Sequence, residues 1–265
     1  MSINKEKIDV FLLIGQSNAI GCGNVEDSIL PRGAFEYLDT DDIIPMRKFL
    51  ELSRGNGTIA QSFSKSWKED TGKKLCFIQS AVDGSMIKNW GHDRYNYLDD
   101  AIYKYENAVS KLDKIYEVDK AYAIWIQGES DGKYGTDPIY YKNALIDLGD
   151  KLNKIGIEKT FVSQTGYWDG TNPLRMEVIM VAQEEACRES SNLILCSKKG
   201  PTFKERKMLI DEVHYNQNAL NELGKDIEKA IYNYCKEEKT IEIPDEINLN
   251  DAKGIYFKLK EIINY

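Results

Sequence analysis

The chain alternates between short apolar runs and longer segments in which apolar residues recur every three or four positions. Each short run is typical of a strand buried on both faces. These runs cover residues 10–14, 75–81, 121–126, 160–163 and 193–196. The helical spacing predicts amphipathic helices over residues 58–72, 98–112, 138–156, 173–188 and 216–235. Strand and helix alternating five times predict a three-layer α/β/α sandwich around a parallel sheet of about five strands.

Two stretches do not follow this alternation. Residues 24–57 show no clear period and contain several prolines and glycines, so we expect an elaborated loop beside the site. Near the end, residues 240–247 and 254–263 are expected to add a strand and a helix. We therefore predict one domain over residues 1–235, with a C-terminal extension, 236–265, packed on it.

Composition narrows the function classes. The net charge of −8 argues against a nucleic-acid partner, because such proteins concentrate positive charge. No apolar run approaches the roughly 18 residues of a membrane span, and the first residues lack a signal-peptide pattern. The five cysteines are odd in number and form no C-x-x-C pair, so we expect reduced thiols in a cytoplasmic protein.

Small polar residues follow the first predicted strand directly, in the order Gly15, Gln16, Ser17 and Asn18. The carboxyl ends of strands in α/β sheets are where ligand sites form. A serine placed there, two residues after a glycine that permits a tight turn, is a candidate nucleophile. The same residues are also ordinary turn formers, so the choice depends on whether the chain supplies a base.

The chain has only two histidines to serve as that base. His214 follows Asp211 by three residues, just before the last helix of the alternating region. An acid in this position of a turn can accept the second imidazole N–H, which fixes the tautomer and stabilises the imidazolium. The alternative is a polar turn that leads into a helix. His92 stands among polar residues and is expected to be exposed or to contact substrate.

Three predicted strand ends offer hydrogen-bond donors for the oxyanion of an acyl-transfer intermediate. Ser17 and Gly84 offer backbone N–H groups, and Gln127 offers a side-chain amide. The topology brings these ends to one edge of the sheet. Gln16 and Asn18, beside the serine, are further candidates for oxyanion or substrate binding. The sequence contains no phosphate loop, no G-x-G-x-x-G fingerprint and no zinc-ligand spacing, so we expect no cofactor and no metal.

Four sequence blocks, in this order, resemble the SGNH-type carbohydrate acetylesterases, which include sialate O-acetylesterase-like and family 6 acetylxylan esterase-like proteins. The blocks are Gly15-Gln-Ser17-Asn18, Asp83-Gly84-Ser85-Met-Ile-Lys-Asn-Trp90, Trp125-Ile-Gln127-Gly-Glu129-Ser-Asp131 and Asp211-Glu-Val-His214-Tyr215. The resemblance runs from about residue 8 to 235. It implies an SGNH or flavodoxin-like fold and a metal-independent serine esterase that removes acetyl groups from sialic acid or an acetylated glycan.

The resemblance also implies roles by position. Ser17 would be the nucleophile, His214 the base and Asp211 its partner. Gly84 and Gln127 would contribute to the oxyanion hole. The implied partner is a small-molecule or oligosaccharide substrate.

Two questions stay open at this point. Some family members use the glutamate of the third block as the triad acid, which makes Glu129 a rival to Asp211. Asp83 stands where the family usually has glycine, and it adds a charge and a Cβ beside the oxyanion donors. A catalytically silent sugar-binding relative is therefore one alternative, and an acyltransferase or lipid esterase on the same scaffold is another.

Overall fold

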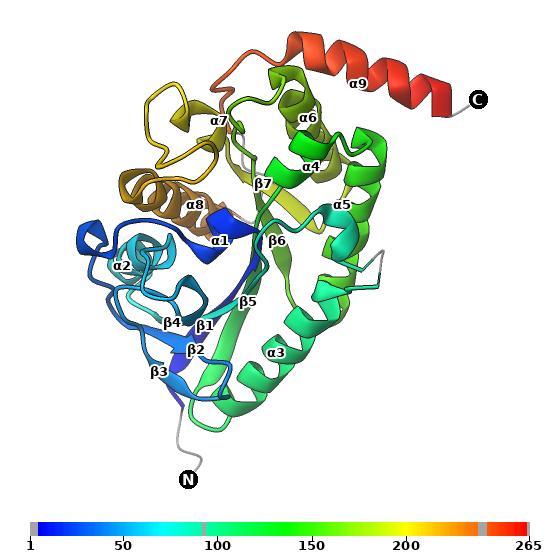
Figure 1. Ribbon diagram of the computed structural model, residues 1–265. Helices are drawn as coiled ribbons and strands as arrows, with labels where there is room; N and C mark the ends of the chain where they lie inside the picture. The colour runs from blue at the N-terminus through cyan, green and yellow to red at the C-terminus, as the bar shows by residue number, and fades with distance from the viewer. Residues whose placement is uncertain (1–4, 92–93, 238–242, 264–265) are drawn as a thin grey trace.

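The computed structural model describes residues 5–91, 94–237 and 243–263. Its strands are β1 (Lys7–Gly15), β2 (Ala34–Tyr37), β3 (Ile43–Pro45), β4 (Lys74–Ala81), β5 (Glu117–Ile126), β6 (Lys159–Ser163) and β7 (Leu193–Ser197). Within the described residues they form one sheet in the order β3-β2-β4-β1-β5-β6-β7, parallel except for the β2–β3 pair (Figure 1). The five predicted strands are confirmed as β1, β4, β5, β6 and β7, but the sheet has seven strands rather than five.

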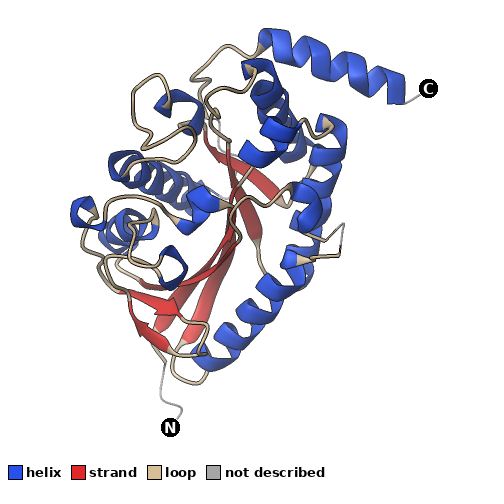
Figure 2. Ribbon diagram, in the orientation of Figure 1, coloured by secondary structure: helices blue, strands red, loops and turns tan. Residues whose placement is uncertain are grey.

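Helices cover both faces of this sheet, as Figure 2 shows. They are α1 (Ser17–Ile20), α2 (Ala60–Thr71), α3 (Tyr97–Leu112), α4 (Glu129–Tyr134), α5 (Pro138–Lys154), α6 (Pro173–Glu189), α7 (Gly200–Phe203), α8 (Gln217–Glu237) and α9 (Asn250–Ile263). One apolar cluster lies between the sheet and α3, α5 and α6, and a second lies between the sheet and α2 and α8. The predicted α/β/α sandwich is confirmed, because β1 is buried between both clusters as its unbroken apolar run requires.

The prediction of an elaborated loop over residues 24–57 is wrong in part. β2 pairs with β4 in parallel, and β3 adds an antiparallel edge strand beside β2. Each strand is only three or four residues long, which is too short for an alternating pattern to stand out in the sequence. The rest of the stretch contains two single 3₁₀ turns, Val25–Asp27 and Glu51–Ser53.

The C-terminal residues form a helix but no strand in their described part. α9 lies against α5 and α6 and buries Tyr256, which confirms the predicted helix. Residues 240–242 of the predicted strand lie outside the described residues. Residues 243–247 are not a strand, since Pro244 lacks a ladder donor and Asp245 pairs with Lys198. The division into residues 1–235 and 236–265 stays a prediction.

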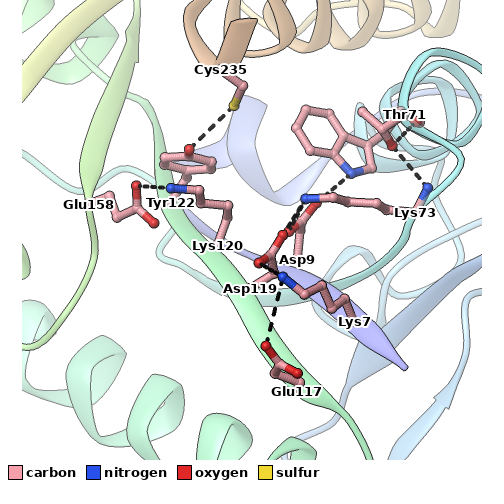
Figure 3. A network of polar contacts seen from close by, with 11 residues as sticks. Lys7, Asp9, Thr71, Lys73, Glu117, Asp119, Lys120, Tyr122, Glu158 and Cys235 are labelled. Atoms are coloured by element: carbon pink, nitrogen blue, oxygen red, sulfur yellow. Dashed lines mark hydrogen bonds and ion pairs between the residues drawn. The ribbon is translucent and has the colours of Figure 1, made fainter. Parts of the chain in front are cut away.

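An ionic network closes the amino ends of the central strands (Figure 3). The fully buried carboxylate of Asp9 on β1 accepts hydrogen bonds from Trp67 Nε1 at 3.1 Å and from Lys73 Nζ at 3.3 Å. Asp119 on β5 binds Lys73 at 2.6 Å and Lys7 at 2.7 Å. Burial raises the pKa of Asp9, whereas the hydrogen bonds from Lys7 and Lys73 lower the pKa of Asp119 to about 2.

Candidate active site

Three central strands end side by side at the carboxyl edge of the sheet, opposite the ionic network. Gly15 of β1 pairs with Ala81 of β4 and with Ile126 of β5. The polar residues that follow these strands are therefore neighbours in space, although more than 100 residues separate the first from the last along the chain. The predicted meeting of the three strand ends is confirmed.

The turn between β1 and α1 requires glycine. Gly15 has φ of 134°, and a Cβ on it would lie 2.0 Å from the carbonyl oxygen of Ile126. The sharp turn makes Ser17 the first residue of α1, and its side chain is almost buried, with 4 % exposed. The backbone N–H of a first helical residue has no acceptor within its helix, so the Ser17 N–H is available to a ligand.

His214 is held by the carboxylate that the sequence predicts. Its Nδ1 lies 2.7 Å from Asp211 Oδ2, and Asp211 Oδ1 accepts the backbone N–H groups of Val213 and His214 at 2.9 and 2.8 Å. Partial burial alone would raise the pKa of Asp211, but these hydrogen bonds outweigh it and lower the pKa. The ring is 25 % exposed and its Nε2 is left for another partner. This is the arrangement of a general base with an orienting acid.

Asn18 connects the serine to the histidine loop. Its Oδ1 accepts the Tyr215 N–H at 3.0 Å, and its Nδ2 donates to the Val213 carbonyl at 3.3 Å and to Glu129 Oε1 at 2.7 Å. The side chain next to Ser17 thus binds the residues on both sides of His214. These contacts occupy the amide of Asn18, which favours a positioning role over the predicted contact with substrate.

The Glu129 carboxylate is hydrogen-bonded to Asn18 and not to the His214 ring. It is fully buried, and burial raises its pKa even though the Asn18 amide donates to it. Among the described residues the carboxylate bonded to His214 is that of Asp211. The geometry therefore favours Asp211 over Glu129 as the acid that orients the base.

Gln127 and Gln16 join the loops that follow the three strands. The buried Gln127 amide nitrogen donates to the Ser85 carbonyl at 3.0 Å, to Gln16 Oε1 at 3.3 Å and to the Asp131 carboxylate, while Tyr141 Oη donates to its oxygen at 3.0 Å. Both amide protons of Gln127 are directed at buried acceptors in this conformation. The contacts favour a bracing role for Gln127 and Gln16 over the predicted donation to an oxyanion.

Gly84 and Asp83 lie at the open mouth of the site. Gly84 has φ of 64°, and in the described part of the chain its N–H has no acceptor. Asp83 is exposed. Cys22, whose thiol contacts the Ser17 carbonyl, has its pKa raised to about 11 by burial and by the carboxylates of Asp83 and Asp211. Two carboxylates, Asp83 and Asp211, therefore act electrostatically on the thiol that contacts Ser17.

Sequence reasoning missed one aromatic neighbour of the histidine loop. Trp168 follows β6, and its Nε1 donates to Glu212 Oε2 at 3.2 Å while Lys133 Nζ lies 3.6 Å from its ring centroid. Its place after the fourth predicted strand was the available signal. His92, the other candidate histidine, lies outside the described residues.

Two classes of site are not found in the described part of the chain. None of its His, Cys, Asp and Glu side chains gather in threes or more as a metal ion would need. The helices of the same residues also lack one with the length and apolarity to cross a membrane.

Solved structures share this fold at low sequence identity. A protein of Arabidopsis thaliana has a TM-score of 0.64 at 21 % identity, with 86 % of this chain and 98 % of that one covered. A carbohydrate acetylesterase from Xanthomonas citri has a TM-score of 0.60 at 14 % identity, covering 88 % of this chain but only 57 % of that one. The psychrotrophic esterase EstA from Pseudoalteromonas has a TM-score of 0.53 at 11 % identity, with coverage of 86 % and 99 %. These likenesses show an SGNH hydrolase-like fold.

The solved structures show only the fold, whereas a family model assigns the chain to a family. None of the curated proteins compared with the sequence is a match. The model described as carbohydrate esterase, sialic acid-specific acetylesterase matches residues 7–233, a range that contains all four sequence blocks. The chain belongs to the sialic acid-specific acetylesterase family of carbohydrate esterases.

Proposed function

We propose that the protein is a serine esterase that removes O-acetyl groups from a carbohydrate through an acetyl-serine intermediate. One observation carries the proposal. The residue next to Ser17 binds both neighbours of His214, and the ring of this histidine is held by the Asp211 carboxylate. Membership of a carbohydrate esterase family supports the ester-hydrolase class.

In the proposed mechanism, Ser17 Oγ attacks the acetyl carbonyl carbon while His214 Nε2 takes the hydroxyl proton. The backbone N–H groups of Ser17 and Gly84 stabilise the oxyanion of the tetrahedral intermediate. The intermediate collapses and expels the sugar oxygen, which receives the proton from His214. A water molecule, activated by the same histidine, then attacks the acetyl-serine and releases acetate.

The remaining predicted site residues act by positioning. Asp211 fixes the His214 tautomer with the proton on Nδ1 and stabilises the imidazolium. Asn18 and Glu129 hold the histidine loop against α1. Gln16 and Gln127 fix the strand-end loops that carry the oxyanion donors. None of the three amide side chains touches the reacting atoms in this scheme.

Asp83 supports a second candidate function, a catalytically silent sugar-binding protein. Its charge stands beside the Gly84 N–H and disfavours an oxyanion there. Asp83 is exposed, so water screens its carboxylate and the penalty is small. We therefore favour the active esterase.

A hydrolysis panel tests the proposal. The substrates are p-nitrophenyl acetate, butyrate and octanoate, together with acetylated xylo-oligosaccharides and O-acetylated sialic acid, and Ser17→Ala is the control. We expect acetate to be the preferred acyl group, and we expect its release from at least one sugar by the wild type alone. Sugar binding without hydrolysis would favour the silent relative, octanoate preference a lipid esterase, and transfer to a second sugar an acyltransferase.

A further inference from the structure

A cavity of about 350 Å³ lies one strand away from Ser17, and the proposed acetyl transfer does not use it. Its lining includes residues at the carboxyl ends of β2 and β4 and on one side of α3. These elements are labelled in Figure 1. Part of its wall is the 37–41 turn, which belongs to the stretch that showed no period in the sequence. Carboxyl ends of strands are where α/β sheets bind ligands.

α3 turns a polar and aromatic stripe toward this cavity. Asp100, Tyr103, Lys104 and Asn107 line it, and their spacing of three and four residues places them on one helix face. The buried side of α3 is a separate stripe, which includes Leu98, Ala101, Tyr105, Ala108 and Leu112. Tyr103 is 69 % exposed, which is unusual for a large aromatic ring. A polar helix face normally meets open solvent, whereas this one forms the wall of a hollow.

The lining has the chemistry that recognises a neutral, polyhydroxylated ring. Tyr97 and Tyr103 supply aromatic surface, and Asn107 supplies an amide. Three carboxylates, those of Asp39, Asp41 and Asp100, accept hydrogen bonds from hydroxyl groups. Aromatic walls with a few convergent polar groups are typical of small-molecule sites.

The charge of the lining selects against anions. Its single ammonium group, Lys104 Nζ, is occupied by the Asp39 carboxylate and by the Gln79 carbonyl. The Asp41 carboxylate lies 4.0 Å from Lys111 Nζ, so Asp100 is the lining carboxylate without an ion pair among the described residues, and three carboxylates against two lysines leave the cavity net negative. An anionic sugar such as sialic acid or a uronic acid is repelled by this negative charge.

Two residues of the cavity wall are hydrogen-bonded to the turn that carries Ser17. Gln79 lines it, and the Gln79 amide donates to the carbonyls of Ala19 and Ile20 at 2.8 and 2.9 Å, which ties it to α1. Val82 also lines it, and the Val82 N–H donates to the Gly15 carbonyl at 2.9 Å. The cavity therefore begins at the residue that follows β4, two positions before Gly84.

We propose that this cavity is a subsite for a neutral sugar residue of an oligosaccharide whose acetylated residue is bound at Ser17. The inference rests on the proposed esterase function and narrows its substrate class to acetylated neutral oligosaccharides. Tyr103 is the stacking platform of the subsite, and Asp100 and Asn107 bind hydroxyl groups of the sugar.

The first test measures kcat and KM of wild type and Tyr103→Ala on acetylated xylotetraose and on p-nitrophenyl acetate. The loss of one stacked ring predicts a KM for the tetraose that is about tenfold higher, with kcat little changed. The ratio of kcat/KM for the tetraose to that for the small ester therefore falls about tenfold. Phe257→Ala removes an exposed ring from α9, away from the cavity, and is expected to leave both activities unchanged. An unaltered ratio in Tyr103→Ala overturns the subsite.

The second test is independent of catalysis. Calorimetric titration of the Ser17→Ala variant with unacetylated xylotetraose and mannotetraose is expected to show binding of at least one, weakened about tenfold by adding Tyr103→Ala. If the enzyme proves inactive but this binding is found, the proposed hydrolysis fails and the subsite stands. Absence of binding to both tetraoses, or tighter binding of tri-galacturonate or an amine-bearing chitosan tetramer, overturns the proposed ligand class.

Discussion

The two ends of β1 differ in how fully their polar groups are hydrogen-bonded. At the amino end, Asp9 and Asp119 are matched by lysines, and Trp67 completes the contacts of Asp9 (Figure 3). At the carboxyl end, the Gly84 N–H has no acceptor among the described residues, and the His214 ring is held on one side only. Polar groups whose hydrogen bonds are all satisfied form a structural network. Polar groups left without a partner are available to bind and act on a ligand.

Each end has one buried carboxylate whose pKa is raised and one more exposed carboxylate whose pKa is lowered, Asp119 being the lowered one at the amino end. Burial raises the pKa of both Asp9 and Glu129, whereas hydrogen bonds lower the pKa of the half-exposed Asp211. An acid that must stabilise an imidazolium at neutral pH has to be ionised, and this condition is best met by Asp211. Because the proposed catalytic groups all lie at the carboxyl end, substitutions at the two ends of the sheet should separate catalysis from stability.

The largest effect is expected for Ser17→Ala. Without the nucleophile, kcat for p-nitrophenyl acetate should fall by about 10⁵–10⁶, as it does when a triad nucleophile is removed. The melting temperature should change little, because one oxygen atom is lost at a nearly buried position with room for alanine. Steady-state hydrolysis and thermal melting followed by circular dichroism measure both quantities, and retained turnover would exclude Ser17 as the nucleophile.

Asp211→Asn should give the next largest loss, about 10⁴ in kcat, because the amide no longer enforces the tautomer that leaves Nε2 free. Glu129→Gln is its matched control. It keeps an acceptor for the Asn18 amide, so we expect a loss of stability of about 1 kcal/mol and a far smaller change in kcat. The same assays apply, and a dead Glu129→Gln beside an active Asp211→Asn would transfer the acid role to Glu129.

Asn18→Ala should lower both the stability and kcat. It removes the contacts with Val213, Tyr215 and Glu129 and leaves buried groups unpaired, at a cost of about 1–3 kcal/mol. The histidine loop then loses its position relative to Ser17, so kcat should fall while KM changes little. Urea unfolding and kinetics on the same preparation test this, and a normal kcat would show that the loop is held without Asn18.

The smallest effect is expected at the amino end. Asp119→Asn should lower the melting temperature at pH 7 by about 2–4 °C, because a paired carboxylate on the surface contributes up to about 1 kcal/mol. Since the folded pKa of Asp119 is lowered to about 2, its contribution is present above pH 4 and is lost as the pH falls toward 2. The difference in melting temperature between the wild type and Asp119→Asn should disappear over that pH range. The two proteins should have the same kcat at every pH. A lower kcat in Asp119→Asn would contradict the assignment of stability to the amino end and catalysis to the carboxyl end.

The parts of the fold and site that the sequence predicts are those encoded locally. β1, β4 and β5 are unbroken apolar runs that end in glycine or polar residues, so both the strands and the position of the chemistry can be predicted. β2 and β3 were missed because they are too short to show a period.

The roles of individual amides could not be predicted, because they depend on distant partners. Their position in the sequence predicts that Asn18 and Gln127 contact the oxyanion or the substrate, whereas their hydrogen bonds to other loops favour a positioning role. Asn18 binds residues about 195 positions away along the chain. The structural role of Asp9 could not be predicted for the same reason, because Lys73 and Trp67 are close to it only in the folded chain.

Covalent trapping of the nucleophile tests the central claim most directly. The wild type is treated with phenylmethanesulfonyl fluoride, and peptide mass spectrometry locates the sulfonyl group while hydrolysis of p-nitrophenyl acetate is followed in parallel. The account predicts a single modified residue, Ser17, with loss of activity in proportion to its modification and no adduct in Ser17→Ala. Hydrolysis that persists when Ser17 is fully modified, or an inactivating adduct on another residue, would contradict it.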